Sequence, residues 1–130
     1  MTFDKRIVLI VIPDDNLRNE LSEALQENGC PFSYEVVSNT NEAQNILSQG
    51  IVQAIIMTKS VALLGDDGTN GIITSQLELP PTVTLLQQGD GYPDYLYIPG
   101  AFHDWCTIPF DLQELYKRLF GVMKRSNNLH

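Results

Sequence analysis

Positive charge is scarce in this chain. Eight lysine and arginine residues stand against sixteen aspartates and glutamates, so the formal net charge is −8. Nucleic-acid binding needs a positive surface that neutralises phosphates, and anionic membranes attract basic segments for the same reason. The sequence therefore argues against nucleic acid and against a membrane surface as direct partners.

Long apolar runs and metal-binding motifs are also absent. No segment approaches the roughly 20 apolar residues of a membrane-spanning helix. Residues 1–6 contain no signal-peptide core, so we expect a cytoplasmic protein. Cys30 and Cys106 form no Cys-x-x-Cys pair, and His103 and His130 have no metal-ligand spacing with them. We expect free thiols, and we predict no metal and no cofactor.

What the chain does contain is an alternation of two periodicities. Short apolar runs rich in valine and isoleucine alternate with segments whose leucines recur at helical spacing. This alternation predicts an α/β fold with a doubly wound parallel sheet and helices on both faces. We expect one domain over residues 1–123 and a polar tail over 124–130. The expected strands are residues 6–12, 32–37, 52–57, 82–86 and 105–108.

Polar residues with capping chemistry predict the helix starts. Asp14 or Asp15 can cap a helix over residues 15–28, because a short acidic side chain accepts from the first free backbone N–H groups. Asn39 with Glu42, and Asp111 with Glu114, have the spacing of a capping box and predict the starts of two more helices. Gly29 and Gly50 predict the ends of the first two helices.

The segment between the fourth and fifth strands is irregular. Residues 87–104 contain two prolines and three glycines, which exclude a regular long helix there. The same segment concentrates aromatic side chains. These are Tyr92, Tyr95, Tyr97 and Phe102, followed by Trp105.

Two segments carry a resemblance to a known family. Residues 100–110, Gly-Ala-Phe-His-Asp-Trp-Cys-Thr-Ile-Pro-Phe, resemble the Gly-Ala…Asp-Tyr-x-x-Lys-Pro-Phe segment of CheY-like receiver domains, with one extra residue. Val-Leu-Ile-Val at 8–11, followed by Leu17-Arg18, matches the first strand and helix of that family. The resemblance covers roughly residues 5–122. It implies a five-stranded flavodoxin-like sheet of order 2-1-3-4-5 with a shortened or irregular fourth helix.

The resemblance also implies a phosphorylation pocket, and here its reactive groups are missing. In the family, two acidic residues after the first strand hold Mg²⁺, an aspartate after the third accepts the phosphoryl group, and a hydroxyl and a lysine assist. Aliphatic side chains cannot do this electrostatic work. The chain therefore resembles a degenerate receiver, or pseudo-receiver. Its pocket positions are Ile12, Pro13, Asp14, Thr58, Leu86 or Gln87, and Ile108.

Two alternatives stay open. Moving the alignment by two residues would recruit Asp14 and Asp15 as the acidic pair, but Thr58 and Ile108 would remain. The aromatic residues 92–105 either fill the core in place of a helix or form a partner surface, since Tyr and Trp are enriched in binding hot spots. The resemblance places Trp105 at the aromatic switch position of the family's output surface.

The leading hypothesis is a signalling module that acts by protein–protein contact, without phosphorylation and without enzymatic activity. Its candidate partner-binding residues are Tyr92, Tyr95, Tyr97, Phe102 and Trp105, and we also consider a homodimer through that surface. The alternative is a small-ligand sensor that uses the former pocket, at the carboxyl ends of the strands. An enzyme is the weakest hypothesis, because the first strand ends in no glycine-rich phosphate cradle and no nucleophile–base pair is evident.

Overall fold

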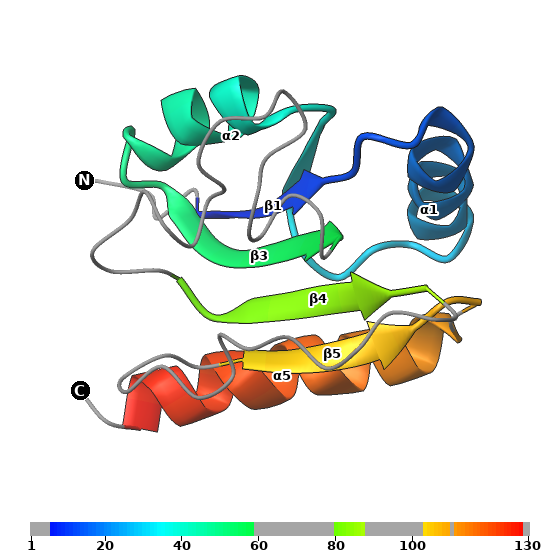
Figure 1. The fold of residues 1–130 in the computed structure, drawn as a ribbon. Helices are drawn as coiled ribbons and strands as arrows, with labels where there is room; N and C mark the ends of the chain where they lie inside the picture. The colour runs from blue at the N-terminus through cyan, green and yellow to red at the C-terminus, as the bar shows by residue number, and fades with distance from the viewer. Residues whose placement is uncertain (1–5, 59–79, 88–102, 110, 129–130) are drawn as a thin grey trace.

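The protein forms one five-stranded parallel sheet, seen in a computed structural model that describes residues 6–58, 80–87, 103–109 and 111–128 (Figure 1). The strand order is β2-β1-β3-β4-β5. The predicted fold class and strand order are therefore confirmed. The elements are β1 (Ile7–Val11), α1 (Asp15–Glu27), β2 (Tyr34–Val37), α2 (Thr40–Leu47), β3 (Val52–Thr58), β4 (Thr82–Leu86), β5 (His103–Thr107) and α5 (Leu112–Asn128).

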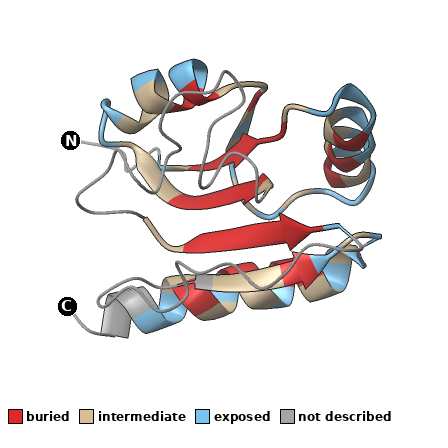
Figure 2. Ribbon diagram, in the orientation of Figure 1, coloured by how far each residue is buried: buried red, intermediate tan, exposed pale blue. Residues whose placement is uncertain are grey.

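The central strands are buried on both faces, which explains their continuous apolar runs. All residues from Val8 to Ile12 are fully buried, as are Ala54 to Met57 in β3. Successive side chains of a strand point to opposite faces of the sheet. A strand that is covered on both sides therefore needs apolar residues at every position. Figure 2 shows this burial along β1, β3 and β4.

The helices divide the core into two layers. On one face, α1 and α5 contribute Leu21 and Leu119 to a cluster that includes Val8 and Ile10 of β1. On the other face, α2 contributes Ala43 to a smaller cluster with Leu9. Figure 1 shows α2 and α5 on opposite sides of the sheet.

Side-chain caps begin the first two helices as their sequences predict. Asp14 caps α1, and its Oδ1 accepts from the backbone N–H of Leu17 at 3.0 Å. Asn39 caps α2, with Oδ1 2.9 Å from the amide nitrogen of Glu42. The Glu42 carboxylate accepts from the N–H of Ser38, one residue before the cap, at 3.3 Å. Local hydrogen bonds thus fix the N-terminal ends of α1 and α2.

Some boundaries differ from the expected ones. The strand β5 begins at His103, two residues before the expected start, because it pairs with β4 along its whole length. The helix α5 continues to Asn128, into the segment expected to be a polar tail. Met123 still packs against the core cluster, which supports this extra length. The expected irregularity of residues 87–104 falls almost entirely outside the described residues.

Two further findings bear on the sequence predictions. Cys30 and Cys106 are free thiols, as predicted, and they lie near opposite edges of the sheet. None of the described helices is long and apolar enough to cross a lipid bilayer.

Candidate functional site

The predicted pocket positions meet at one edge of the sheet, because all five strands are parallel. In register, Val11 pairs with Met57, Thr58 pairs with Leu85, and Leu86 pairs with Thr107. The residues that end β1, β3, β4 and β5 therefore form a continuous row. In open α/β sheets this carboxyl edge is where ligands bind.

The first position, Ile12, is part of the hydrophobic core. Its side chain is fully buried in the cluster that α1 and α5 share, and its N–H donates to the carbonyl of Val37 at 3.1 Å. An aliphatic group in this place offers no oxygen to a hard cation such as Mg²⁺. Ile12 therefore stabilises the fold and cannot be a metal ligand.

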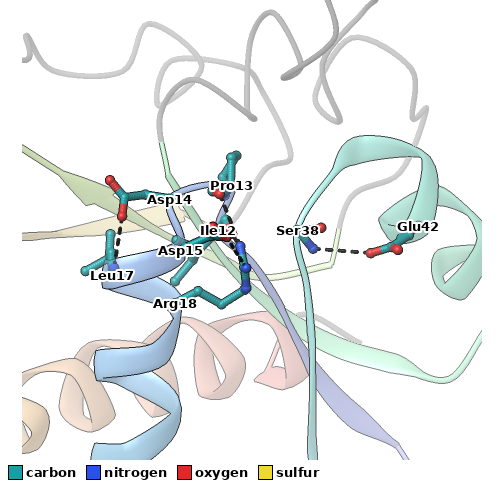
Figure 3. A network of polar contacts seen from close by, with 8 residues as sticks. All are labelled: Ile12, Pro13, Asp14, Asp15, Leu17, Arg18, Ser38 and Glu42. Atoms are coloured by element: carbon teal, nitrogen blue, oxygen red, sulfur yellow. Dashed lines mark hydrogen bonds and ion pairs between the residues drawn. The ribbon is translucent and has the colours of Figure 1, made fainter.

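A guanidinium group occupies the turn that follows β1 (Figure 3). Arg18 Nη1 donates to the carbonyl oxygens of Ile12 and Pro13, at 2.9 and 3.1 Å. Its Nη2 contacts the carboxylate of Asp15. The two carbonyls at the end of β1 are thus bound by a permanent positive charge, since arginine stays protonated in proteins.

Both aspartates of this turn are also engaged. Asp14 accepts the capping hydrogen bond from Leu17, and Asp15 forms an ion pair with Arg18. The alignment that recruits Asp14 and Asp15 as a metal pair thus meets two carboxylates that already have partners. Within the described parts of the chain, no group of three or more His, Cys, Asp or Glu could hold a metal ion.

The ends of β3 and β4 provide no acidic group either. Thr58 is half-buried at the last position of β3. A hydroxyl group cannot form an acyl phosphate, because that product requires a carboxylate. Leu86 is 4% exposed, while the neighbouring Gln87 is exposed. The two candidates for the sensing-hydroxyl position are therefore a core leucine and an exposed glutamine.

The strand β5 leads into Ile108, at the expected lysine position. Its N–H donates to the carbonyl of Leu86 at 2.8 Å, and its side chain packs against the same cluster that contains Ile12. The peptide bond from Ile108 to Pro109 is cis. Ile12 and Ile108 thus place apolar side chains at the positions where the resemblance predicts a metal ligand and a lysine.

A second arginine organises the surface of β5 and α5. Arg118 lies over the Trp105 ring, with 5.9 Å between its Cζ and the ring centroid. It also donates to Asp104 Oδ1 and Glu114 Oε1, both at 2.7 Å. Asp104 Oδ1 accepts from the backbone N–H of Trp105 at 2.8 Å. Trp105 is half-buried, so its ring is held in place while part of it meets solvent.

The electrostatics of this cluster follow from its geometry. Burial lowers the pKa of Arg118, but its hydrogen bonds with Glu114 and Asp104 outweigh this effect, so the net pKa is raised. Burial raises the pKa of the neighbouring Cys106 thiol above its ordinary value of 9.0, although Arg118 opposes the shift. The arginine remains charged and the thiol remains protonated near neutral pH.

The structure covers the predicted residues unevenly. It places the pocket positions and Trp105, whereas Tyr92, Tyr95, Tyr97 and Phe102 lie outside the described residues. Sequence reasoning missed Arg18 and Arg118. Their only local signals are acidic residues at helical spacing: Asp15 three residues before Arg18, and Glu114 four residues before Arg118.

Comparisons with known proteins identify the fold. No family model matches the chain, and no curated protein matches it either. Many solved structures do match, and those described here are receiver domains or response regulators. A putative response regulator from Chloroflexus aurantiacus is 22% identical with a TM-score of 0.65; the match covers 92% of this chain and 99% of that one.

Two other matches are similar in quality. The N-terminal domain of a response regulator/sensory box/GGDEF protein from Carboxydothermus hydrogenoformans is 17% identical with a TM-score of 0.71, over 96% of this chain and 100% of that one. A chain in the Saccharomyces cerevisiae complex between a histidine phosphotransfer protein and the receiver domain of its response regulator is 23% identical. Its TM-score is 0.60, over 92% of this chain and 89% of that one. The chain therefore has the fold of CheY-like receiver domains.

Proposed function

We propose that this protein is a signalling module that works by protein–protein contact and does not depend on phosphorylation. The observation that carries this proposal is the state of the β1–α1 turn. Arg18 binds the carbonyls of Ile12 and Pro13, where the receiver family keeps its metal-binding carboxylates.

A phosphorylation site needs charged groups that these positions lack. A phosphoryl group brings several negative oxygens, which a bound metal and a lysine must neutralise. Here Ile12 and Ile108 belong to the core, and Asp14 and Asp15 are engaged elsewhere. A scaffold without this chemistry retains its surfaces, so binding is the function that it best supports.

The surface around Trp105 supports a protein partner. Tryptophan and arginine dominate binding hot spots, and here Arg118 holds the Trp105 ring in one orientation. A prearranged aromatic group loses little conformational freedom on binding. The neighbouring aromatics from Tyr92 to Phe102 extend this candidate surface in sequence. The yeast complex named above contains a receiver domain with a protein partner, which gives a precedent for the fold.

Intact mass spectrometry tests the absence of phosphorylation. The protein is incubated with acetyl phosphate and Mg²⁺, alongside an active receiver domain as positive control. We expect the control to gain the mass of one phosphoryl group and this protein to gain none. A phosphorylated species that disappears under mild base, as acyl phosphates do, would overturn the proposal.

Partner capture tests the surface. The wild-type protein and a Trp105→Ala variant serve as baits in extract from the source organism. A Gln113→Ala variant, at an exposed position of α5, is the control. We expect a protein that the wild-type and control baits retain and that Trp105→Ala loses. Equal recovery on all three baits would exclude Trp105 from the interface.

The ligand-sensor alternative has less support from the described residues. Ile12 and Leu86 are buried, and Ile108 packs against the core, so these three side chains fill their positions with protein atoms. A ligand that binds the folded state would raise the melting temperature. A saturable rise with a small molecule, lost in an Ile108→Trp variant, would favour this alternative.

A further inference from the structure

An aromatic cluster lies at the surface between α1 and α5. Phe32 follows α1 and makes edge contacts with three rings, those of Tyr116, Phe120 and Tyr34, at centroid distances of 5.8, 6.1 and 6.3 Å. Phe120 is 41% exposed and is the only large apolar side chain in the described part of the chain that is exposed. Exposed apolar groups that join such a cluster mark interaction surfaces more often than scattered ones do.

This cluster is not the Trp105 surface. Phe120 and Arg118 are two positions apart on one helix, and hence about 200° apart around its axis. Arg118 faces Trp105 of β5, whereas Phe120 faces Phe32 at the other side of α5. The two surfaces can therefore be occupied independently.

A basic stripe runs along α5 beside the cluster. Lys117 and Lys124 lie three residues before and four residues after Phe120, which puts both on one flank of its exposed side. Both lysines are exposed, and neither forms an ion pair with another residue that the structure describes. The two lysines are seven positions apart, which corresponds to about 10.5 Å along the helix axis.

An acidic stripe runs along α1. Glu20, Glu23 and Glu27 are exposed and follow the spacing of one helical stripe. Among residues 6–58, 80–87, 103–109 and 111–128, they have no ion-pair partner. Like charges at this spacing repel one another, so a cationic surface placed over them would relieve a local cost. Glu20 and Glu27 are seven positions apart, the same spacing as the two lysines.

We propose that the α1–α5 surface binds a second copy of this chain in a twofold-symmetric dimer. In such an interface the same patch faces itself, so every contact occurs twice. The α1 stripe of each copy would face the α5 stripe of the other, with the helices antiparallel and Phe120 at the centre. One aromatic cluster and two stripes of opposite charge and equal spacing make this surface complementary to itself. The inference goes beyond the proposed function and does not depend on Trp105.

The test is sedimentation equilibrium on the purified protein over a concentration series. At low ionic strength we expect a reversible equilibrium between the 14.6 kDa chain and a species of twice that mass. High ionic strength should weaken it, because salt screens exposed charges. A wild-type protein that stays monomeric over the whole series would overturn the proposal.

Charge reversal gives a sharper version of the test. One variant carries Lys117→Glu and Lys124→Glu, and the other carries Glu20→Lys and Glu27→Lys. Each alone should raise the dissociation constant by at least about tenfold, because like charges then face one another across the interface. Mixed together, the two variants should form a heterodimer, since one charge contact then keeps its native sign and the other is restored with reversed sign.

Matched controls separate this surface from total charge. Glu35→Lys with Asn45→Lys raises the net charge by about 3, close to the change of about 4 in the α1 variant, but both residues are exposed and lie away from the α1–α5 surface, on β2 and α2. Circular dichroism checks that each variant folds. Phe120→Ser should also weaken the dimer. Equal weakening by the control pair, or no heterodimer from the mixture, would overturn the proposal.

Discussion

Removal of the Arg18 guanidinium should loosen the turn that follows β1. In an Arg18→Met variant the aliphatic part of the side chain is kept, but the hydrogen bonds to the Ile12 and Pro13 carbonyls are lost. Hydrogen bonds to charged groups contribute about 1.5–3 kcal/mol when buried. The Arg18 side chain is 21% exposed, and water can replace part of these contacts. We therefore expect the free energy of unfolding to fall by about 1–2 kcal/mol in total.

The Asp15 contact should contribute much less. The Asp15 side chain is 80% exposed, and ion pairs at the surface contribute about 0–1 kcal/mol. Asp15→Asn should therefore leave the free energy of unfolding nearly unchanged. So should Arg125→Met, which makes the same arginine-to-methionine change at an exposed position of α5.

Urea unfolding, followed by circular dichroism, measures all three variants. An unchanged urea dependence with a lower midpoint would show a loss of stability of the native state. The reasoning would be refuted if Arg18→Met matched the wild-type protein, or if Asp15→Asn cost as much as Arg18→Met.

Three further predictions concern the core and the β5 surface. Ile12→Val should cost about 0.5–1.5 kcal/mol of unfolding free energy, and Ile12→Asp considerably more, because a carboxylate would be buried without a partner; equal urea midpoints for the two variants would contradict the burial of Ile12. Arg118→Met should change the fluorescence of Trp105, the single tryptophan, and cost about 1 kcal/mol of unfolding free energy, whereas Arg125→Met should change neither; an unaltered spectrum would exclude the ring contact. Because the folded-state pKa of Cys106 is raised, its contribution to stability is present below pH 9.0 and is lost as the pH rises further; unfolding midpoints measured from neutral to alkaline pH should fall less steeply in Cys106→Ala.

The sheet could be predicted from the sequence because its strands obey a simple rule. Positions 8–11 and 54–57 are apolar throughout, and only a strand covered on both faces needs that pattern. β5 is the exception. Its sequence His-Asp-Trp-Cys-Thr is mostly polar, so its start was placed two residues late. Pairing with β4, which sequence patterns do not reveal, fixes that boundary.

The candidate site likewise has one part that the sequence predicts and one part that it does not. Parallel topology brings Ile12, Thr58, Leu86 and Ile108 to one edge, so their meeting could be predicted once the strands were known. The roles of Arg18 and Arg118 depend on side-chain rotamers. Arg18 turns back onto two carbonyls, and Arg118 reaches Asp104 fourteen residues away, which no local spacing indicates.

The central claim is that the carboxyl edge of the sheet carries no phosphorylation chemistry. Amide NMR spectra of the protein with and without Mg²⁺ and beryllofluoride, which mimics a phosphoryl group, test this claim most directly. We predict that the resonances of Asp14, Thr58 and Ile108 stay in place as both are added. Saturable shifts at these residues would contradict the account, because they would show that carboxylates of this chain form a working acidic site.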